Sequence, residues 1–580
     1  MKRILFFVHY NKYNGFSGYV TYLLEHIKHI YDRIVFVSNS PVSGDNLKKL
    51  KELCDDIIIR ENKGFDFGAW KDALLKEGRE KLSQFDNVTL MNDSCFGPVF
   101  DLQDIYTNME RENIDFWGLT LHKKSKNGMP GSNAPIPEHI QSYFICFNKS
   151  VIFSNIFYKF WEAVKYFDDV NKVISCYETK LTLLLSNNGF KYSVKYAPNI
   201  GADIIYENVA TMHPDFIIKN NIPLIKIKSF IHFTYQKYII DLIQKKTNYP
   251  VDLIYNHVTE VFNPNLSLQI FNKLVPAIPV NECISTESIA VHLHAFYLDI
   301  FEIYLDYFNN ISIDFDLFIT TDTVDKKNKI KGYLKNTNTE KHLKDIIVTE
   351  NRGRDILPWL NISDVLSKYD VVGHFHTKKT AFAEEWIGIT WQNDILELLL
   401  VPINKIIDEF NKNSTIGIII PEIPICYRFN PSLQDKKFSC SKLNEMWKRS
   451  NCKKELDFFD LNTIIMPYGN MFWYRPAALQ SLFQMQLTSD DFATEPLKND
   501  LTTAHFIERL PVYYAWNNDF DYRIMVFYPT KLSTFIDHMI LSDTYYSIKH
   551  SKSYRIGRFM LIIPKFIKYL LNFLILHCKK

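Results

Sequence analysis

The sequence has little glycine and no framework of paired cysteines. Its 580 residues include 19 Gly against 44 Phe and 33 Tyr, and its 9 cysteines are scattered, odd in number and never arranged as CxxC. This spacing argues against disulfides and against a structural zinc site, and it indicates reduced thiols in a cytoplasmic protein. The net charge of +2 argues against a strongly basic nucleic-acid-binding protein.

Long uninterrupted apolar runs are also missing. The apolar run near the N-terminus, in "MKRILFFVHY", covers only about five residues, which is too short for a signal-peptide core and suits a buried strand. The segment 558–580 is strongly apolar, but Pro564, Lys565, Lys568 and Asn572 interrupt it before it reaches the ~20 residues of a spanning helix. Its polar residues fall on one helical stripe, which is typical of an amphipathic helix lying in a membrane interface. A helix packed on the protein's own core is the alternative.

What is present is a series of apolar runs alternating with helix-like segments, which predicts an α/β fold with mostly parallel sheets. The series occurs twice in the same order: "ILFFVHY", "RIVFVSNS" and "NVTLMNDS" in the first half correspond to "IAVHLHAFY", "IDFDLFITTD" and "YDVVGHFHTKKT" in the second. Such ordered recurrence predicts two domains of related fold. The predicted boundaries are 1–214 for the first domain, 215–285 for a connector, 286–545 for the second domain, and 546–580 for an amphipathic tail.

One polar segment recurs with special precision. "ENKGFDFGAW" (61–70) and "ENRGRDILPW" (350–359) keep Glu, Asn, Gly, Asp and Trp at the same spacing. The Gly and Asp suit a tight strand-to-helix turn with the Trp packed behind it. Asn-Lys-Gly is also an ordinary turn sequence, and duplication alone would preserve a turn that the fold needs.

Polar residues follow the apolar runs, at the edge where parallel sheets bind ligands. Hydroxyl, amide and carboxylate groups at this edge can hold a nucleotide sugar. The nucleotide-sugar-binding candidates are Asn39, Asn62, Asp66, Asn92 and Ser94 in the first half, and Asp322, Asn351, Asp355, His374, His376, Thr377 and Lys378 in the second.

Two of these edges carry distinct chemistry. In "GHFHTKKT" the two histidines share one face of a strand and precede two lysines, so the cluster could neutralise a diphosphate without a metal. A solvated lysine pair is the alternative, and a zinc site is a poorer interpretation because no matching cluster is nearby. In "LMNDSCFGP", Asp93 could bind a divalent cation (Mg or Mn) that bridges a diphosphate, or act in catalysis.

Candidates for a general base come late in each half. Glu178 lies in "SCYETKLTLLLSNNG", while Asp500, His505 and Glu508 lie in "NDLTTAHFIERLPVYYA". An inverting sugar transfer needs one such group to accept the proton of the acceptor hydroxyl. A charge on a helix surface is the alternative for each of them.

The succession of these motifs resembles the rhamnan synthesis protein F family, bacterial proteins of polysaccharide assembly. The resemblance rests on "HYNKYNGFSGYVTYLL", "ENKGFDFGAW", "MNDSCFGPV", "ENRGRDILPW", "HFHTKKT" and "TTAHFIERLPVYYA" and spans roughly residues 4–520. It implies two tandem GT-A-like domains that transfer L-rhamnose from dTDP-L-rhamnose to a polyprenyl-diphosphate-linked glycan at the inner face of the plasma membrane. A partly non-catalytic scaffold or glycan-binding component, or a transferase for another nucleotide sugar, stays open as an alternative.

Overall fold

The structure, a computed structural model, describes residues 1–13, 15–125, 135–197, 208–232, 236–280, 287–377, 385–424, 436–461, 463–495 and 500–527. The chain divides into two compact units. The first consists of Met1–Lys273, Pro431–Met466 and Ala477–Asp521, and the second of Leu274–Asn430, Pro467–Pro476 and Tyr522–Lys580. No helix among the described residues is both long and apolar enough to cross a membrane, and the predicted tail at 546–580 lies outside them.

The first unit contains an eight-stranded sheet in the order β3-β2-β1-β4-β8-β6-β7, with β9 paired to β6. Its strands are β1 (Arg3–His9), β2 (Arg33–Ser38), β3 (Asp56–Ile59), β4 (Asn87–Asn92), β6 (Phe116–His122), β7 (His139–Ile140), β8 (Phe144–Asn148) and β9 (Tyr192–Tyr196). Strands β3, β2, β1 and β4 are parallel, and β8 is antiparallel to both β4 and β6. A short antiparallel ribbon joins β5 (Cys95–Phe96) to β10 (Ile225–Lys226).

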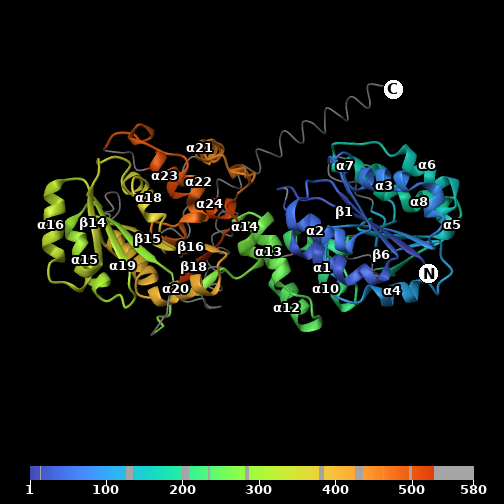
Figure 1. Ribbon diagram of the computed structural model, residues 1–580, viewed down its shortest axis with the longest axis horizontal. Helices are drawn as coiled ribbons and strands as arrows, with labels where there is room; N and C mark the ends of the chain where they lie inside the picture. Colours follow the sequence, from blue (N-terminus) through green and yellow to red (C-terminus); the bar gives the residue numbers. More distant parts are fainter. Residues whose placement is uncertain are drawn as a thin grey trace, which may run out of the picture. The chain divides into compact units, whose positions relative to one another are not determined.

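Helices cover both faces of this sheet because β1 is apolar on both sides. Leu5 and Phe7 belong to one buried cluster, and Ile4, Phe6 and Val8 belong to another, as alternate residues of a strand must. Helices α3 and α6 lie on one face, and α1 and α4 on the other (Figure 1). The helices up to residue 187 are α1 (Gly18–Ile27), α2 (Gly44–Leu53), α3 (Phe65–Leu82), α4 (Leu102–Met109), α5 (Lys149–Ile152), α6 (Asn155–Ala163), α7 (Val170–Val173) and α8 (Thr179–Asn187).

The region predicted as a connector is built into the first unit's core. It follows α9 (Val209–Met212), and its helices are α10 (Pro214–Lys219), α11 (Ser229–His232), α12 (Gln236–Lys246), α13 (Asp252–Val261) and α14 (Pro264–Ile270). Ile217, Ile254 and Val258 are buried in the same cluster as Leu5 and Phe7. Since these side chains complete one face of the first sheet, the segment is part of a domain and does not form a separate spacer.

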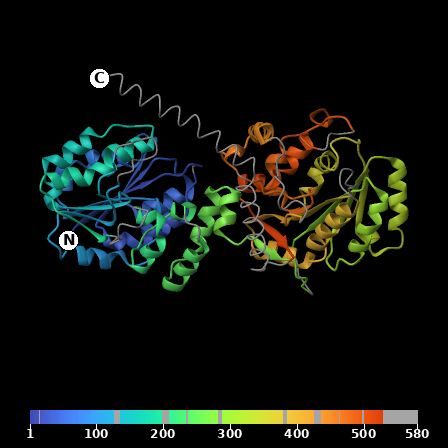
Figure 2. The ribbon, with the colours of Figure 1, turned by 180° about the vertical axis from the view of Figure 1, so that it is seen from behind.

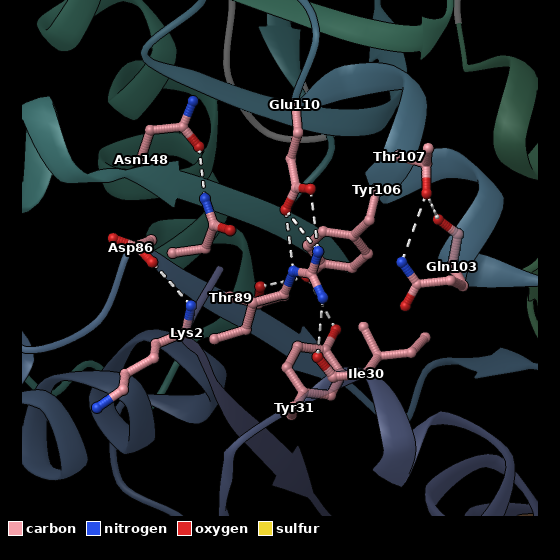
Figure 3. A network of polar contacts seen from close by, with 12 residues as sticks. Lys2, Ile30, Tyr31, Asp86, Thr89, Gln103, Tyr106, Thr107, Glu110 and Asn148 are labelled. Atoms are coloured by element: carbon pink, nitrogen blue, oxygen red, sulfur yellow. Dashed lines mark hydrogen bonds and ion pairs between the residues drawn. The ribbon is translucent and has the colours of Figure 1, made fainter.

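A polar network anchors the start of β1 (Figure 3). The Arg3 guanidinium donates two hydrogen bonds to Glu110 Oε1, at 2.9 and 2.8 Å. The hydroxyl of Tyr106 lies 3.0 Å from that of Tyr31 and 2.5 Å from Thr89 Oγ1. These bonds join β1 and β4 to α4. The network therefore stabilises the amino-terminal side of the sheet and uses no side chain of the carboxyl edge.

The second unit contains a second eight-stranded sheet, in the order β11-β18-β16-β17-β15-β12-β13-β14. Its strands are β11 (Leu274–Pro276), β12 (Ile289–His294), β13 (Asp316–Thr321), β14 (Leu343–Val348), β15 (Val371–His376), β16 (Ile416–Pro421), β17 (Phe472–Tyr474) and β18 (Asp521–Val526). Strands β14, β13, β12 and β15 are parallel, and β17 is antiparallel to both β15 and β16. Helices lie on both sides of this sheet in the two views (Figures 1 and 2).

The two sheets follow the same strand order. The path β3-β2-β1-β4-β8-β6 in the first unit corresponds to β14-β13-β12-β15-β17-β16 in the second. Each apolar run that the sequence paired between the halves occupies the corresponding place in its sheet. The remaining helices of the second unit are α15 (Leu298–Asn309), α16 (Val324–Leu334), α17 (Ile356–Leu360), α18 (Ser363–Leu366), α19 (Glu385–Leu399) and α20 (Ile403–Lys412).

Part of the later sequence belongs to the first compact unit. Helices α21 (Lys436–Arg449), α22 (Gln480–Phe483), α23 (Thr503–Glu508) and α24 (Pro511–Asn517) all fall within its residue ranges. Trp447 of α21 stacks on Tyr514 of α24, with ring centroids 5.6 Å apart. The sequence predicted that residues 286–545 form one domain, whereas this small aromatic core belongs to the first compact unit.

Candidate functional site

The repeated segment makes the same turn in both units. In the first, Gly64 (φ 72°) and Phe65 (φ 51°) are both left-handed, and in the second Gly353 (φ 66°) and Arg354 (φ 57°) are left-handed at the same places. Glycine tolerates this conformation without the penalty that a Cβ atom imposes. At Gly64 a Cβ would also meet the Cα of Tyr166 at 3.1 Å. The prediction that the segment forms a strand-to-helix turn is therefore confirmed.

The turn brings one aspartate in each unit to the carboxyl edge of its sheet, where an asparagine side chain holds it. Asn92 Nδ2 donates to Asp66 Oδ2 at 2.7 Å, and Asn470 Nδ2 donates to Asp355 Oδ2 at 2.7 Å. The tryptophans that close the repeats, Trp70 and Trp359, are fully buried. They serve as packing residues beneath the turn.

Asn39 braces this turn in the first unit. Its Oδ1 accepts a hydrogen bond of 2.5 Å from Arg60 Nη1, and its Nδ2 donates to the Phe65 carbonyl at 3.3 Å. The same guanidinium donates to the Lys63 carbonyl at 2.8 Å. The side chain that was predicted to bind a nucleotide sugar thus holds the backbone that presents Asp66, and a ligand-binding role for Asn39 stays a prediction.

Three consecutive predicted residues follow β4. Asn92 Oδ1 accepts a hydrogen bond of 2.6 Å from Ser94 Oγ, which fixes the orientation of the Asn92 amide. Asp93 Oδ2 accepts a hydrogen bond of 2.8 Å from the Tyr10 amide. Burial raises the pKa of Asp93 to about 8, and the charge of nearby Asp66 adds to this rise. The hydrogen bond from the Tyr10 amide acts in the opposite direction. The edge therefore carries two carboxyl groups, Asp66 and Asp93, whose pKa values are raised mainly by burial, with a further contribution from a nearby carboxylate (Glu178 for Asp66, Asp66 for Asp93).

Glu178 reaches the same place from a π-helical turn, Ile174–Glu178. Turns of this type are rare and are found frequently at functional sites. Glu178 Oε1 accepts a hydrogen bond of 3.0 Å from the Ser142 amide. Burial would raise the pKa of Glu178, but Lys226, His139 and the Ser142 amide together hold it below its ordinary value. Glu178 is thus an anion at neutral pH and can accept a proton.

Lys226 supplies a cation that the sequence did not reveal. It lies in β10, where it pairs with Cys95 of β5, and its Nζ is 3.4 Å from Ser94 Oγ and 4.8 Å from the centre of the Tyr143 ring. Its charge partly opposes the burial that raises the pKa of Asp66, and it helps to hold the pKa of Glu178 below its ordinary value. We call Asp66, Asn92, Asp93, Ser94, Glu178 and Lys226 the first edge.

The first edge suits a divalent cation of the Mg or Mn type. Such ions are held by one or two carboxylates and by substrate phosphates. A cation would favour the ionised form of Asp93, whose pKa is raised mainly by burial and further by the charge of Asp66. Within the described residues no group of three or more His, Cys, Asp or Glu side chains is arranged to bind a metal by itself. Asp66 and Asp93 are the residues that would hold the ion, together with a ligand's own oxygens.

The second unit has two buried histidines on β15, the strand that corresponds to β4 of the first unit. His374 and His376 of β15 are almost inaccessible to solvent. Asp355 Oδ2 lies 3.6 Å from His374 Nε2 and 3.7 Å from His376 Nε2. Burial would raise the pKa of Asp355, but His376, His374 and Asn470 hold it well below its usual value. The two histidines that were predicted to bind a diphosphate thus contact other buried groups of the second unit. Lys378 lies outside the described residues.

The other predicted residues of the second unit have varied surroundings. Thr377 caps two strands, since its amide donates to the His294 carbonyl and its hydroxyl accepts from the amides of Phe296 and Tyr297. Asp322 forms an ion pair of 2.7 Å with Lys326, and Asn351 is exposed. Asn62 of the first unit carries a buried Oδ1 that has no hydrogen-bond partner among the described residues. These four assignments to ligand binding stay predictions.

The late general-base candidates of the second half lie in the first compact unit. Asp500 forms an ion pair of 3.0 Å with Arg509, so the positive guanidinium balances the charge of its carboxylate. Thr502 Oγ1 is 2.7 Å from His505 Nδ1, and Glu508 ends the same short helix, α23. Catalytic roles for His505 and Glu508 stay predictions.

A model of the family described as "Rhamnan synthesis protein F" matches residues 34–520. The chain belongs to this family. Curated relatives of the chain include "Uncharacterized protein y4gN" of Sinorhizobium fredii, 31% identical over 30% of this chain and 44% of the relative. "Uncharacterized protein WxcX" of Xanthomonas campestris pv. campestris is 30% identical over 39% and 31%. "Virulence protein VirA" of Vibrio anguillarum is 29% identical over 35% and 56%.

The matched region spans between about a third and just over a half of each relative's length. Among solved structures, the glycosyltransferase GlyE of Streptococcus pneumoniae TIGR4 has a TM-score of 0.23 and 12% identity, over 67% of this chain and 89% of that one. A putative nucleotide-diphospho-sugar transferase from Desulfovibrio desulfuricans G20 has a TM-score of 0.22 and 14% identity, over 42% and 97%. Likenesses this weak carry no argument about function, so the case below rests on family membership and on the first edge.

Some of the residues of interest left a signal in the repeated motifs of this sequence, and others did not. His292 and His294 repeat the i, i+2 spacing of His374 and His376 on the paired strand, so comparison of "HLH" with "HFH" could have found them. Lys226 comes from the segment without a counterpart in the other half, and its place beside Ser94 depends on a two-residue ribbon.

Proposed function

We propose that the protein is a glycosyltransferase that adds L-rhamnose from dTDP-L-rhamnose to a lipid-linked glycan during bacterial cell-surface polysaccharide synthesis, with the first edge as its active site. Membership of the rhamnan synthesis protein F family supports the class of reaction. The observation that carries the site is the convergence of an ionised Glu178, two carboxyl groups and Lys226 at one sheet edge. The two units are proposed as GT-A-like domains.

Each group has a role in an inverting transfer. Glu178, kept anionic by Lys226 and the Ser142 amide, accepts the proton of the attacking sugar hydroxyl. Lys226 stabilises the negative charge that grows on the departing nucleoside diphosphate, as fixed cations do most effectively in sites shielded from water. A divalent cation held by Asp66 and Asp93 would add to the same neutralisation.

The test is transfer of label from dTDP-L-rhamnose to a lipid-linked primer by the purified protein. Glu178→Gln should lower kcat about 100-fold because the substitution keeps the shape and removes the base. Lys226→Met should lower kcat by a similar factor because the leaving group loses its cation. Glu162→Gln and Lys246→Met, at exposed positions, are the matched controls and should retain wild-type rates.

Three outcomes separate this proposal from its alternatives. No transfer to any primer from any donor favours a scaffold or glycan-binding component of an assembly complex. Transfer with equal efficiency from several nucleotide sugars refutes the preference for rhamnose. Full activity in Glu178→Gln and Lys226→Met refutes the first edge as the active site.

Attachment to the inner face of the membrane is proposed from the sequence of residues 546–580, which lie outside the described residues. Co-sedimentation of the full chain with anionic vesicles tests it, and equal partitioning after removal of 558–580 would contradict it.

A further inference from the structure

A pocket opens on the amino-terminal side of the second sheet, at the end opposite the carboxyl edge. Its lining comes from residues at or just before the first residues of β12, β13, β14 and β15. The pocket has a volume of ≈ 410 Å³, within the range of about 300–1,000 Å³ that is usual for small-molecule sites. Strand β12 has six residues, so about 20 Å of strand separates the pocket from the carboxyl edge.

Two carboxylates of the lining are already balanced by partners within the second unit. The Arg475 guanidinium donates to both carboxylate oxygens of Glu287, at 3.1 and 3.0 Å. Asp316 accepts a hydrogen bond of 2.6 Å from the Tyr369 hydroxyl and forms an ion pair of 3.1 Å with Lys344. Their charges are therefore compensated before any ligand binds.

Three other groups of the lining are still available to a ligand. Asp314 and Lys341 are exposed, and their side chains form no hydrogen bond or ion pair with a described residue. Only 8% of His342 is exposed, yet it lines the pocket. Its Nδ1 lies 3.0 Å from the Phe315 carbonyl, which can only accept, so Nδ1 carries the proton and Nε2 presents a lone pair. That Nε2 has no hydrogen-bond partner among the described residues.

These groups suit a neutral ligand that carries several hydroxyls. The one uncompensated anion, Asp314, and the one uncompensated cation, Lys341, balance each other, so the lining offers no excess charge to a diphosphate or a polyamine. A hydroxyl can donate to the carboxylate and to His342 Nε2, and it can accept from the ammonium. The Phe315 ring is stacked on the His342 ring with centroids 4.2 Å apart, and aromatic side chains of this kind are common in the walls of small-molecule sites.

A metal ion fits the pocket less well. Among the described residues, no group of three or more His, Cys, Asp or Glu side chains is arranged to bind one. Burial also lowers the pKa of His342, so its ring is neutral at pH 7 and adds no positive charge for an anionic ligand. A sugar ring, which is uncharged and carries hydroxyls on several sides, therefore meets the requirements of the lining.

We propose that this pocket binds a neutral sugar residue of a glycan, with Asp314 and His342 Nε2 accepting hydrogen bonds from its hydroxyls and Lys341 donating to them. Sugar binding by the pocket does not depend on the proposed function. The identity of that glycan as the acceptor, held by the second unit during transfer at the first edge, rests on the proposed function.

Ring ¹⁵N NMR of the full-length protein labelled at histidine tests the binding. The His342 signals are identified by their loss in His342→Gln. The probes are the methyl glycosides of L-rhamnose, D-glucose and N-acetyl-D-glucosamine. At least one of them should shift the Nε2 signal of His342, because a hydroxyl then donates to that nitrogen, whereas dTDP should leave the signal in place. No shift with any glycoside, or a shift with dTDP alone, would overturn the proposal.

Two exposed side chains allow a test that does not disturb the core. Asp314→Ala and Lys341→Met should each raise the Kd of the bound glycoside about tenfold, because each removes a hydrogen bond to a charged group. Asp306→Ala and Lys331→Met, at exposed positions outside the lining, are the matched controls and should keep the wild-type Kd. A wild-type Kd in both Asp314→Ala and Lys341→Met would refute the assignment of the pocket.

Transferase assays with the lipid-linked glycan separate this pocket from the proposed function. Asp314→Ala and Lys341→Met should raise the KM for the glycan about tenfold, and the effect should not extend to kcat or to the KM for dTDP-L-rhamnose. Weaker glycoside binding with a wild-type KM for the glycan would overturn the acceptor role alone. A wild type that binds a glycoside but transfers no sugar would refute the proposed function, and the pocket would remain a glycan-binding site.

Discussion

A single buried histidine can make the stability of the first unit depend on pH. His257 of α13 lies 2.9 Å from Ser17 Oγ, and its ring packs edge-on against Tyr19 and Phe96. Burial lowers the pKa of His257 to about 4. The folded protein therefore keeps this ring neutral at a pH where the unfolded chain, with a pKa of about 6.5, has bound a proton.

The sign of the pH effect follows from this difference. Above pH ~6.5 neither state binds the proton and stability is unaffected. As the pH falls towards 4 the unfolded state gains a proton that the folded state refuses, so the free energy of unfolding falls by up to about 2 kcal/mol per such histidine at pH 5. Thermal unfolding at pH 7 and pH 5 should show the wild type losing stability, and His257→Gln should lose less over the same interval.

Exposed His29 offers the control. His29→Gln should keep the wild-type dependence of the melting temperature on pH. An equal loss between pH 7 and 5 in the wild type and in His257→Gln would mean that His257 binds a proton as readily in the folded state as in the unfolded chain, which its burial argues against.

At the scale of elements, the strand-to-helix turn is the feature that links sequence to site most directly. Gly64→Ala should lower the free energy of unfolding by about 1–3 kcal/mol, because Ala is strained at a φ of 72° and its Cβ would press on the Tyr166 backbone. Urea unfolding measures the loss. The same substitution should also weaken any ligand that depends on Asp66, since the turn positions that carboxyl group.

Gly332→Ala is the matched control for this substitution. Gly332 lies inside α16, and an added Cβ there would meet nothing within 4 Å. In a helix interior Ala is favoured over Gly by about 0.5–1 kcal/mol, so this variant should gain stability. Equal effects of the two substitutions would contradict the conformational explanation.

These elements also show how far a sequence alone can lead. The turn at "ENKGFD" was predictable because glycine and aspartate directly after a strand favour a tight turn. The strands were predictable because each apolar run is buried on both faces. The contacts of Asp66 and Asp355 were not predictable. Their asparagine partners lie 26 residues and 115 residues away in the chain, and only the paired strands bring them together.

For the whole molecule, two sheets of the same strand order carry different chemistry at their carboxyl edges. The sequence predicted that the difference would lie at "MNDS" and "HFHTKK", and the residues there do differ in kind: partly buried carboxyl groups beside Lys226 in one unit, and buried histidines in the other. Lys226 was not predicted, because it lies in the segment predicted as a connector. That segment has no counterpart in the other half, so there is no second motif to compare it with. The two sheets thus share a strand order, and the residues at their carboxyl edges differ.

This division predicts how many nucleotides the chain binds. Binding of a diphosphate needs cations and metal-binding oxygens, and the first edge holds both kinds of group in Lys226 and the carboxyl groups of Asp66 and Asp93. The described histidines of the second unit are instead occupied with one another and with Asp355. Isothermal titration with dTDP in the presence of Mg²⁺ should therefore give one site per chain. Lys226→Met should weaken that site by at least tenfold, whereas Asp322→Asn, at the edge of β13, should leave it unchanged. Two equal sites would mean that the second unit binds a nucleotide as well, and a single site lost with Asp322→Asn would assign the nucleotide to the second unit.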